Sequence, residues 1–160
     1  LEEIIVSSTR IRSALTNGDI HIANEFLGYN YFLDGTVVPG NKLGATLGYP
    51  TANIHVENEH KLIPRYGIYV IGVSKLNGEN DDTIHPGVMS IGIRPTISDN
   101  RETIEANIFD FNGDLYGRKL RIHFLKYIRP ELKFENLDLL KQKMQEDEKM
   151  AREFWKNEMK

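Results

Sequence analysis

Five strand-like segments follow one another with no helical pattern between them, and this succession constrains the fold more than any other feature of the sequence. Each segment is rich in β-branched or aromatic residues and ends near a polar, glycine or proline turn; they span residues 31–38, 66–73, 88–93, 103–111 and 119–125. Parallel pairing would require crossover connections, usually helices. The sequence therefore predicts a mainly β domain with an antiparallel sheet, curled into a small barrel because closure removes exposed edges.

Helical patterns lie on both sides of the strand region. The Ser-Ser-Thr run at residues 7–9 precedes a short apolar pattern that stops at Gly18, which predicts an N-capped helix. Asp19 begins a second short pattern, which ends at Gly28. Beyond Pro130, apolar residues recur at helical spacing with charges between them, which predicts one long amphipathic helix packed on the barrel; they are Leu137, Leu140, Met144, Ala151, Phe154 and Trp155.

The composition argues against several classes of protein. The 160 residues carry 20 Lys and Arg against 23 Asp and Glu, and the net charge of −3 argues against non-specific nucleic-acid binding. The absence of cysteine excludes disulfides, thiolate catalysis and cysteine-ligated zinc. No apolar run approaches the ~20 residues of a membrane span, and no signal-peptide pattern is present. We therefore expect a cytoplasmic protein without membrane or nucleic-acid partners and, because the chain begins at Leu1, one that is part of something longer.

Residues 40–53 form a stretch whose composition suits phosphate binding. It contains three glycines within nine positions and one lysine, which would bring backbone N–H groups and an ammonium close to phosphate oxygens: Gly40, Lys42, Gly44 and Gly48. The Walker A spacing is absent. Thr51 and Asn53 alternate by two, so on an extended segment their oxygens project to one side and would suit Mg²⁺. The alternative is a glycine-rich turn leading into a strand, with Thr51 and Asn53 as turn-forming residues.

Glu105 is a second candidate, because it stands at the centre of the apolar-rich segment 103–109. If it lines a cavity, its carboxylate would accept a proton from a substrate hydroxyl. The alternative is a solvent-exposed strand residue. Arg94 and Arg129 each precede a proline, where a guanidinium would pair with a phosphate or a carboxylate, or form a surface salt bridge.

Six short motifs, taken together and in this order, resemble riboflavin kinase, specifically the C-terminal module of bacterial bifunctional riboflavin kinase/FAD synthetases. They are Ser-Ser-Thr-Arg-Ile-Arg at 7–12, Leu-Gly-Tyr-Pro-Thr-Ala-Asn at 47–53, Ser-Ile-Gly-Ile-Arg-Pro-Thr at 90–96, Ile-Glu at 104–105, Asp-Leu-Tyr-Gly at 114–117 and Ile-Arg-Pro-Glu at 128–131. Any one of them is modest, but Pro-Thr-Ala-Asn followed by the glutamate strand, Leu-Tyr-Gly and Arg-Pro-Glu is specific. The resemblance runs from residue 7 nearly to the C-terminus.

The resemblance implies a six-stranded antiparallel Greek-key barrel with short N-terminal helices and a long C-terminal helix. It implies an enzyme that phosphorylates the 5′-hydroxyl of riboflavin, with ATP as donor and Mg²⁺ as cofactor, giving FMN and ADP. By position, Glu105 matches the catalytic base, and Thr51 and Asn53 match the residues that hold Mg²⁺ and the nucleotide phosphates. The other matches are an ATP and phosphate segment at Gly40, Lys42, Gly44, Gly48 and Pro50, and a flavin and flap region at Asp114, Tyr116 and Arg129.

The sequence departs from the family pattern at three positions. Ala45 stands where a basic residue is common, Ser90 where asparagine is common, and Asn107 where histidine is common. None of the three is a residue to which the resemblance gives a chemical role, so the departures bear on affinity and kinetics rather than on the reaction.

The resemblance also divides the chain. Residues 1–28 match the end of a preceding adenylyltransferase module, and residues 29–160 match the riboflavin kinase domain. The His-x-x-His signature of the adenylyltransferase is absent, so this chain is expected not to convert FMN to FAD. Two other functions stay open: a β-barrel that binds nucleic acid or a protein partner, and a flavin- or nucleotide-binding module without catalysis.

Overall fold

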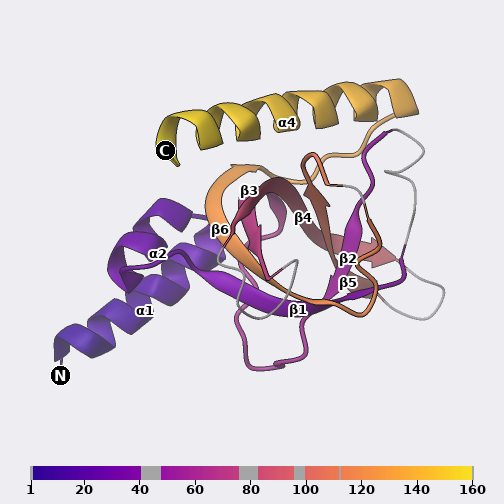
Figure 1. The fold of residues 1–160 in the computed structure, drawn as a ribbon. Helices are drawn as coiled ribbons and strands as arrows, with labels where there is room; N and C mark the ends of the chain where they lie inside the picture. Colours follow the sequence, from indigo (N-terminus) through magenta and orange to yellow (C-terminus); the bar gives the residue numbers. More distant parts are fainter. Residues whose placement is uncertain (1, 41–47, 76–82, 96–99, 112, 160) are drawn as a thin grey trace.

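A computed structural model describes residues 2–40, 48–75, 83–95, 100–111 and 113–159. Its centre is a closed barrel of six antiparallel strands in the order β1-β2-β5-β4-β3-β6 (Figure 1). The strands are β1 Phe32–Val38, β2 Ala52–His55, β3 Gly67–Ser74, β4 His85–Pro95, β5 Asn100–Ile108 and β6 Lys119–Arg129. The first strand pairs with the last, which closes the sheet. The predicted six-stranded antiparallel barrel is confirmed.

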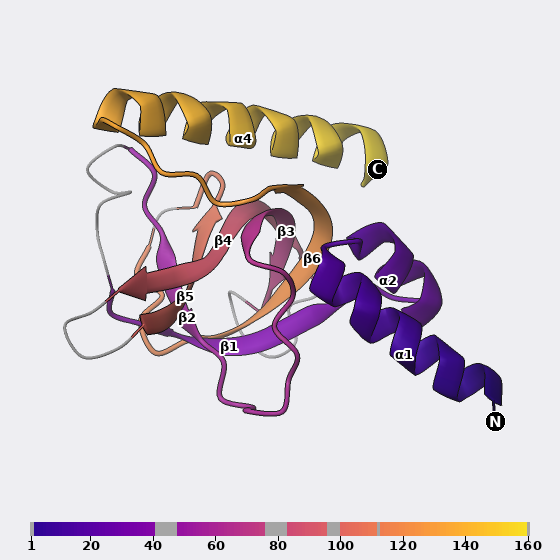
Figure 2. The ribbon, with the colours of Figure 1, turned by 180° about the vertical axis from the view of Figure 1, so that it is seen from behind.

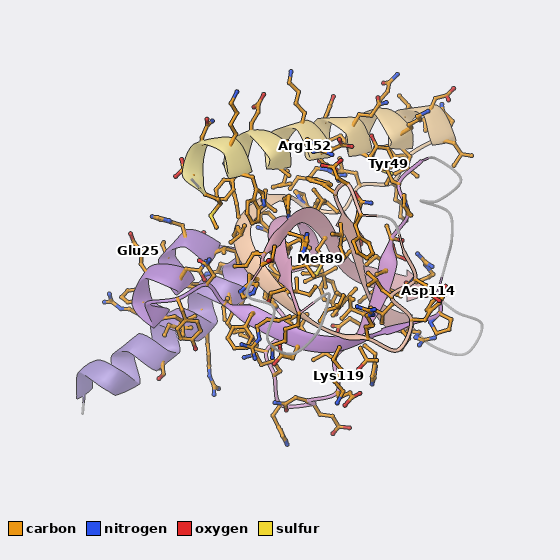
Figure 3. The ribbon with its side chains drawn as sticks, in the orientation of Figure 1. Glu25, Tyr49, Met89, Asp114, Lys119 and Arg152 are labelled. Atoms are coloured by element: carbon orange, nitrogen blue, oxygen red, sulfur yellow. The ribbon has the colours of Figure 1, made fainter. Side chains whose placement is uncertain are left out.

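Apolar side chains from all six strands fill the interior of the barrel. Tyr69 and Phe124 are fully buried and meet edge to face, with ring centroids 4.9 Å apart. Met89 points into the same interior (Figure 3). Interiors of small barrels are packed in this way by side chains rather than left as channels. Polar chemistry must therefore take place on the outer surface of this barrel or at its ends.

Helix α4, Leu137–Glu158, covers one side of the barrel (Figure 2). It begins at Asn136, whose Oδ1 accepts a hydrogen bond from the backbone N–H of Leu139 at 2.9 Å. Near its other end, Trp155 Nε1 donates to the carbonyl oxygen of Ile71 at 3.0 Å. Gly72 permits this close approach, because a Cβ there would lie 3.1 Å from the Trp155 ring. The predicted long helix on the barrel is confirmed.

Because α4 covers β3 from outside, both faces of that strand are buried, and every residue from Gly67 to Ser74 is buried. Tyr69 and Ile71 point into the barrel, whereas Val70 points outward into a second apolar cluster that includes Ala151 of α4. This two-sided burial explains the nearly continuous apolar run in the sequence of β3.

Two helices, α1 Glu2–Asn17 and α2 Ile20–Leu27, pack against each other and against one side of the barrel near β6 (Figure 1). Asn24 joins them to the barrel: its Nδ2 donates to the Phe124 carbonyl at 2.9 Å and its Oδ1 accepts from Tyr31 N–H at 2.8 Å. Gly28 ends α2 in the left-handed region, with φ +80°, as predicted. Of the helices in the described ranges, none is long and apolar enough to cross a membrane.

The predicted helix starts are partly wrong. Residues 7–9 lie inside α1 rather than capping it, because the residues from Glu2 onward contain neither glycine nor proline and the helix extends through them. Asp19 occupies the N-cap position of α2, but its side chain makes no capping hydrogen bond. The predicted positions of both helices are right, and the first is longer than its pattern suggested.

The strand limits also differ from the sequence pattern. The apolar pattern of the sequence did not predict β2, because this strand has only four residues. A sixth strand was expected only because of the family resemblance. The strand predicted over 103–111 ends at Ile108, because Asp110 takes a left-handed conformation with φ +56°. The last strand continues beyond 125 to Arg129, and register irregularities against β3 accommodate the extra length.

The outer face of β6 carries a half-buried histidine. His123 Nε2 lies 2.9 Å from Ser74 Oγ, and burial, with the neighbouring Arg121, lowers the His123 pKa. The unfolded chain therefore binds this proton more readily than the folded chain, and stability falls as pH drops below the ordinary histidine value of about 6.5.

We predict that His123→Gln flattens the pH dependence of the unfolding free energy between pH 7 and 5, measured by urea denaturation. The exposed His60 provides the control, since His60→Gln should keep the wild-type slope; equal slopes for wild type and His123→Gln would contradict the prediction.

Candidate active site

A cavity of about 200 Å³ lies between α4 and the outer face of the barrel. The wall formed by the sheet carries the polar side chains of Thr51, Ser90, Glu105 and Asn107, with the apolar Ile68, Val88 and Phe109 beside them. The opposite wall, formed by α4 and the segment leading to it, carries the apolar Leu132, Phe134, Leu140 and Met144, with the acidic Glu131, Asp147 and Glu148 at its borders. We call this space the helix cavity. Its two walls suit a ligand with an apolar ring on one side and hydroxyl groups on the other.

Strand register explains the polar wall. Glu105 of β5 pairs directly with Asn53 of β2 on one side and with Ser90 of β4 on the other. Directly paired residues project to the same face of a sheet, and the alternating neighbours Ile104 and Ala106 are buried in the barrel core. The row Asn53–Glu105–Ser90 is therefore directed outward, toward the side of the barrel that α4 covers.

Asn53 has a distinct setting within this row. Its amide lies against Gly40, where a Cβ would come within 2.1 Å of the amide carbon. A side chain at position 40 would therefore displace the amide, and glycine at this position leaves the space that Asn53 occupies. Asn53 is half-buried and lies beside the helix cavity rather than in its lining.

A second cavity, of about 280 Å³, is lined on one side by Pro50, Thr51 and Ala52. We call it the loop cavity, because Phe111, Asp114 and Tyr116 line it from the connection between β5 and β6. Asp114 Oδ1 accepts a hydrogen bond from the Tyr116 N–H at 2.9 Å, which stabilises the local turn. Thr51 belongs to the linings of both cavities, so it marks the place where the two spaces meet.

Ion pairs neutralise part of the charge in the helix cavity. Arg94 Nη2 donates to Glu105 Oε1 at 3.3 Å, and both side chains are partly accessible. Glu131 and Glu148 also line this cavity, so acidic groups outnumber the arginines. This balance favours an uncharged ligand, or one accompanied by a cation, over a free anion.

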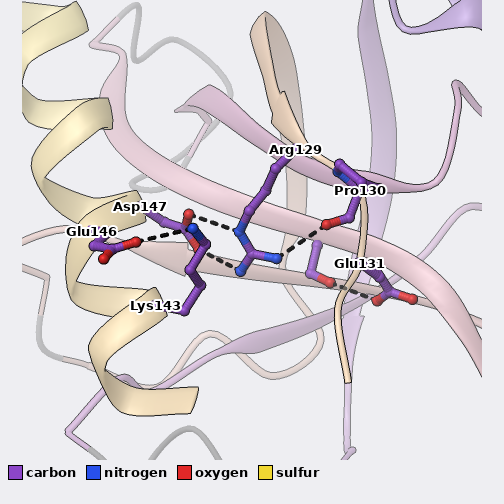
Figure 4. Close-up of polar contacts among 7 residues, drawn as sticks. Arg129, Pro130, Glu131, Lys143, Glu146 and Asp147 are labelled. Atoms are coloured by element: carbon purple, nitrogen blue, oxygen red, sulfur yellow. Dashed lines mark hydrogen bonds and ion pairs between the residues drawn. The ribbon is translucent and has the colours of Figure 1, made fainter. Parts of the chain in front are cut away.

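Arg129 lies at the end of β6 and forms a buried ion pair with α4 (Figure 4). Its Nε and Nη2 donate to the two carboxylate oxygens of Asp147 at 3.0 and 2.7 Å, and its Nη1 donates to the Pro130 carbonyl at 3.1 Å. The side chains of Arg129 and Asp147 are only 13% and 7% exposed. Such a bidentate pair fixes the orientation of both partners. In this structure Arg129 therefore joins the strand to the helix at the cavity wall.

Glu131 holds the segment that follows β6 against the barrel. Its Oε1 accepts a hydrogen bond from Ser90 Oγ at 3.1 Å (Figure 4). Its carboxylate lies so close to Gly92 that a Cβ there would come within 2.1 Å of it. Because Leu132 and Phe134 follow immediately, this contact sets the position of the apolar wall.

The structure brings most of the sequence-predicted site residues together around Thr51. Glu105 and Arg129 line the helix cavity, and Pro50, Asp114 and Tyr116 line the loop cavity. The predicted phosphate residues Lys42 and Gly44, and the departure at Ala45, lie outside the described residues, while Gly40 and Gly48 lie at the ends of that gap.

Sequence reasoning missed the contribution of α4 to the site. Leu140 and Met144 were interpreted only as the apolar face of a helix, and residues 141–152 as a solvated charged face, yet Asp147 is buried within that face and Glu148 lines the helix cavity. No local signal separates a buried aspartate from its exposed neighbours on a charged helix. The aromatic residue at position 134, so close to the Arg-Pro-Glu motif, was the available clue to the apolar wall.

Comparisons with known proteins agree with this fold. The family model described as riboflavin kinase (flavokinase) matches residues 27–155. A bifunctional riboflavin kinase/FMN adenylyltransferase from Listeria monocytogenes is 42% identical over 151 residues, covering 94% of this chain and 46% of that protein. One from Bacillus subtilis is 39% identical over 155 residues, with 95% and 47% covered. The chain thus spans about half the length of the curated relatives that it matches.

Two solved structures resemble the barrel. Riboflavin kinase from Trypanosoma brucei has a TM-score of 0.56 and 27% identity, covering 80% of this chain and 81% of that one. A crystal structure described as a macrolide-efflux protein from Streptococcus pneumoniae has a TM-score of 0.82 and 35% identity, covering 91% and 46%. The fold is thus shared with a protein named riboflavin kinase. The chain belongs to the riboflavin kinase family.

The buried pair of Arg129 and Asp147 predicts an asymmetric effect of substitution on stability. Asp147→Ala leaves a guanidinium buried without its partner, which costs about 3–5 kcal/mol of unfolding free energy. Glu146→Ala, at the next position of the same helix, removes a carboxylate that is 66% exposed and pairs with Lys143, and should cost less than about 1 kcal/mol. Urea denaturation measures both values. Equal losses for the two variants would show that the Arg129–Asp147 pair is not a buried constraint.

Proposed function

We propose that this chain transfers the γ-phosphoryl group of ATP to the 5′-hydroxyl of riboflavin, in a reaction that requires Mg²⁺ and releases FMN and ADP. Membership of the riboflavin kinase family supports riboflavin as substrate and a nucleotide as donor. The observation that carries the proposal is the position of Thr51, which lines both cavities, with Glu105 in one of them. Two substrates that meet at one residue are placed for direct group transfer.

The helix cavity suits riboflavin. The apolar wall, with Phe134, Leu140 and Met144, would contact the uncharged isoalloxazine ring. The polar wall, with Ser90 and Asn107, would face the ribityl hydroxyls. The acidic excess of this cavity also favours the uncharged vitamin over an anionic ligand.

The loop cavity suits the phosphoryl donor. Pro50 and Thr51 line it and follow directly on the segment between Gly40 and Gly48, whose composition suits phosphate oxygens. Within the described part of its lining Asp114 is the single charged residue, so side-chain cations there do not neutralise the phosphates. A bound divalent cation, together with residues 40–48, is proposed to supply that neutralisation.

The residues around Asn53 fit Mg²⁺. Across the described ranges no three or more His, Cys, Asp or Glu side chains gather into a metal cage. Mg²⁺ bound to a nucleotide needs only one or two protein oxygens, since water and phosphate supply the rest. The hydroxyl of Thr51 and the amide oxygen of Asn53 are donors of this kind, and Gly40 leaves room for the amide. The ion would spread the negative charge of the transferring phosphoryl group.

Glu105 is proposed as the general base. Its carboxylate lines the helix cavity together with Asn107. The next residue of its strand, Ala106, pairs with Ala52, which follows Thr51. It would accept the proton of the 5′-hydroxyl as that oxygen bonds to the γ-phosphorus and the bond to the ADP oxygen breaks. The ion pair with Arg94 holds this carboxylate in place before the substrate arrives.

The domain assignment and the partner module belong to the same proposal. In a longer protein an FMN adenylyltransferase module would precede the barrel, as the names and lengths of the relatives suggest, and the enzyme would act in the cytoplasm. The boundary at residue 28 stays a prediction. Leu15, Ile20 and Ala23 pack into the barrel core, so helices α1 and α2 are attached to the kinase barrel whichever module they derive from.

Chromatography tests the proposed reaction directly. The purified chain, incubated with riboflavin, ATP and MgCl₂, is expected to give FMN and no FAD. Excess EDTA should abolish turnover, and added Mg²⁺ should restore it. A folded chain that binds riboflavin but forms no FMN would contradict the proposal and favour a binding module without catalysis.

The proposed base predicts a specific loss of turnover. Glu105→Gln keeps the size of the side chain but cannot accept the proton, so kcat should fall by about 10²- to 10⁴-fold while the riboflavin KM changes little. Glu102→Gln is the matched control on the same strand, because Glu102 accepts a hydrogen bond from Tyr66 at 2.6 Å and lies outside both cavities. Near-normal turnover by Glu105→Gln would remove Glu105 from the chemistry.

A further inference from the structure

A cluster of polar contacts on α4 reaches the borders of both cavities without lining the loop cavity itself. Arg152 donates from Nη1 and Nη2 to the two carboxylate oxygens of Asp110 at 3.0 and 3.1 Å, and from Nε to Glu148 at 2.8 Å. Its guanidinium also lies 4.5 Å from the centroid of the Phe109 ring. Among the described residues, its hydrogen bonds thus go to Asp110, just beyond the end of β5, and to Glu148 of its own helix.

Glu148 extends the cluster to a second part of the chain. Glu148 and Tyr49 line the helix cavity together, and burial, followed by the charge of the Glu148 carboxylate, raises the Tyr49 pKa. Tyr49 lies between Gly48, which has φ +87°, and the Pro50–Thr51 step. Figure 3 shows Tyr49 and Arg152 in the space between α4 and the barrel. The cluster of Tyr49, Glu148, Arg152 and Asp110 is called the latch below.

The two segments that the latch holds are the two borders of the loop cavity. Tyr49 immediately precedes Pro50 and Thr51, which line that cavity from one side. Asp110 immediately precedes Phe111, which lines it from the other side with Asp114 and Tyr116. Asp110 has φ +56°, so the chain turns sharply there, and the fork to Arg152 fixes the turn from outside. No residue of the latch other than Tyr49 and Glu148 lines the helix cavity, and none lines the loop cavity.

We propose that Glu148 and Arg152 are positioning residues that hold the Tyr49 and Asp110 segments at the spacing required by the phosphoryl donor. This inference rests on the proposed function, because it takes the loop cavity as the nucleotide site. The physical basis is preorganisation: segments ordered before binding need not lose their conformational freedom when the nucleotide binds. Breaking the latch shifts that cost to the binding step and weakens affinity for the nucleotide, while leaving the apolar wall for riboflavin intact.

Asp110→Asn is the sharpest variant. Asparagine accepts a left-handed backbone as readily as aspartate, so the turn is not strained. The substitution removes the negative charge and one of the two carboxylate oxygens to which Arg152 donates. Arg152→Lys tests the same contact from the other side, because lysine keeps the charge and loses the planar fork. Lys143→Ala is the control: it breaks the Lys143–Glu146 pair on the same helix, which contacts neither segment.

Calorimetric titration with Mg²⁺ and ADP measures nucleotide affinity without turnover, and steady-state assays give KM for ATP and for riboflavin. For Asp110→Asn and Arg152→Lys we expect the Kd for ADP and the KM for ATP to rise about three- to tenfold, the cost of ordering one or two side chains on binding. The riboflavin KM and kcat should stay within about twofold of wild type. This is expected because the variants weaken binding of the nucleotide equally in the ground state and in the transition state. Lys143→Ala should match wild type in every measurement.

Two results would overturn the inference. One is an unchanged Kd for ADP in both latch variants. The other is a parallel loss of nucleotide and riboflavin binding together with a lowered Tm, which would mean that the latch only stabilises the fold. Failure of the proposed function would be seen separately. A wild-type chain that binds Mg²⁺ and ADP but forms no FMN would refute phosphoryl transfer. In that case the comparison of ADP affinities would still decide whether the latch positions the segments around the loop cavity.

Discussion

The packed interior of the barrel is the constraint on which the rest of the structure depends. Tyr69, Phe124 and their apolar neighbours fill the space inside the strands, so no substrate fits there. Strand alternation then directs the polar residues outward, and register places Asn53, Glu105 and Ser90 side by side. The same pattern that builds a stable core therefore creates a row of polar side chains on the outer surface, which needs a second wall before it forms a site.

Helix α4 supplies that wall, and its attachment has two chemically different parts. Near its C-terminal end, Trp155 packs on Gly72 and donates to the Ile71 carbonyl, a contact dominated by apolar burial. Nearer the cavity, the buried Arg129–Asp147 pair sets the orientation of strand and helix. A buried ion pair contributes little net stability compared with apolar packing, but it tolerates few geometries. Its value here lies in fixing the wall of the cavity rather than in strengthening the fold.

The sequence revealed the parts of this design that depend on local patterns. The succession of strand-like segments predicted the barrel, and helical spacing predicted α4. Strand register brings Asn53 beside Glu105, and Thr51 lines the same cavity as Glu105, while their roles stay predictions. What escaped prediction depends on distant contacts. Four-residue β2 is held by pairing with β1 and β5 rather than by its own composition. Burial of Asp147 follows from the position of Arg129 across the sheet–helix interface, and no property of residues 141–152 alone indicates it.

Thr51 also bears on the kind of reaction that the site supports. Because one side chain borders both cavities, riboflavin and the nucleotide would be bound together, with the acceptor oxygen directed at the donor. Phosphoryl transfer between substrates held in this way needs positioning and charge neutralisation, and no enzyme nucleophile has to carry the phosphoryl group. The polar groups around Thr51 agree with that requirement, since in the proposed reaction the hydroxyl and the amide oxygen would bind the cation and the carboxylate would accept the proton. In the proposed reaction the barrel therefore acts by holding two ligands in one geometry, and the contacts of α4 determine how well that geometry is kept.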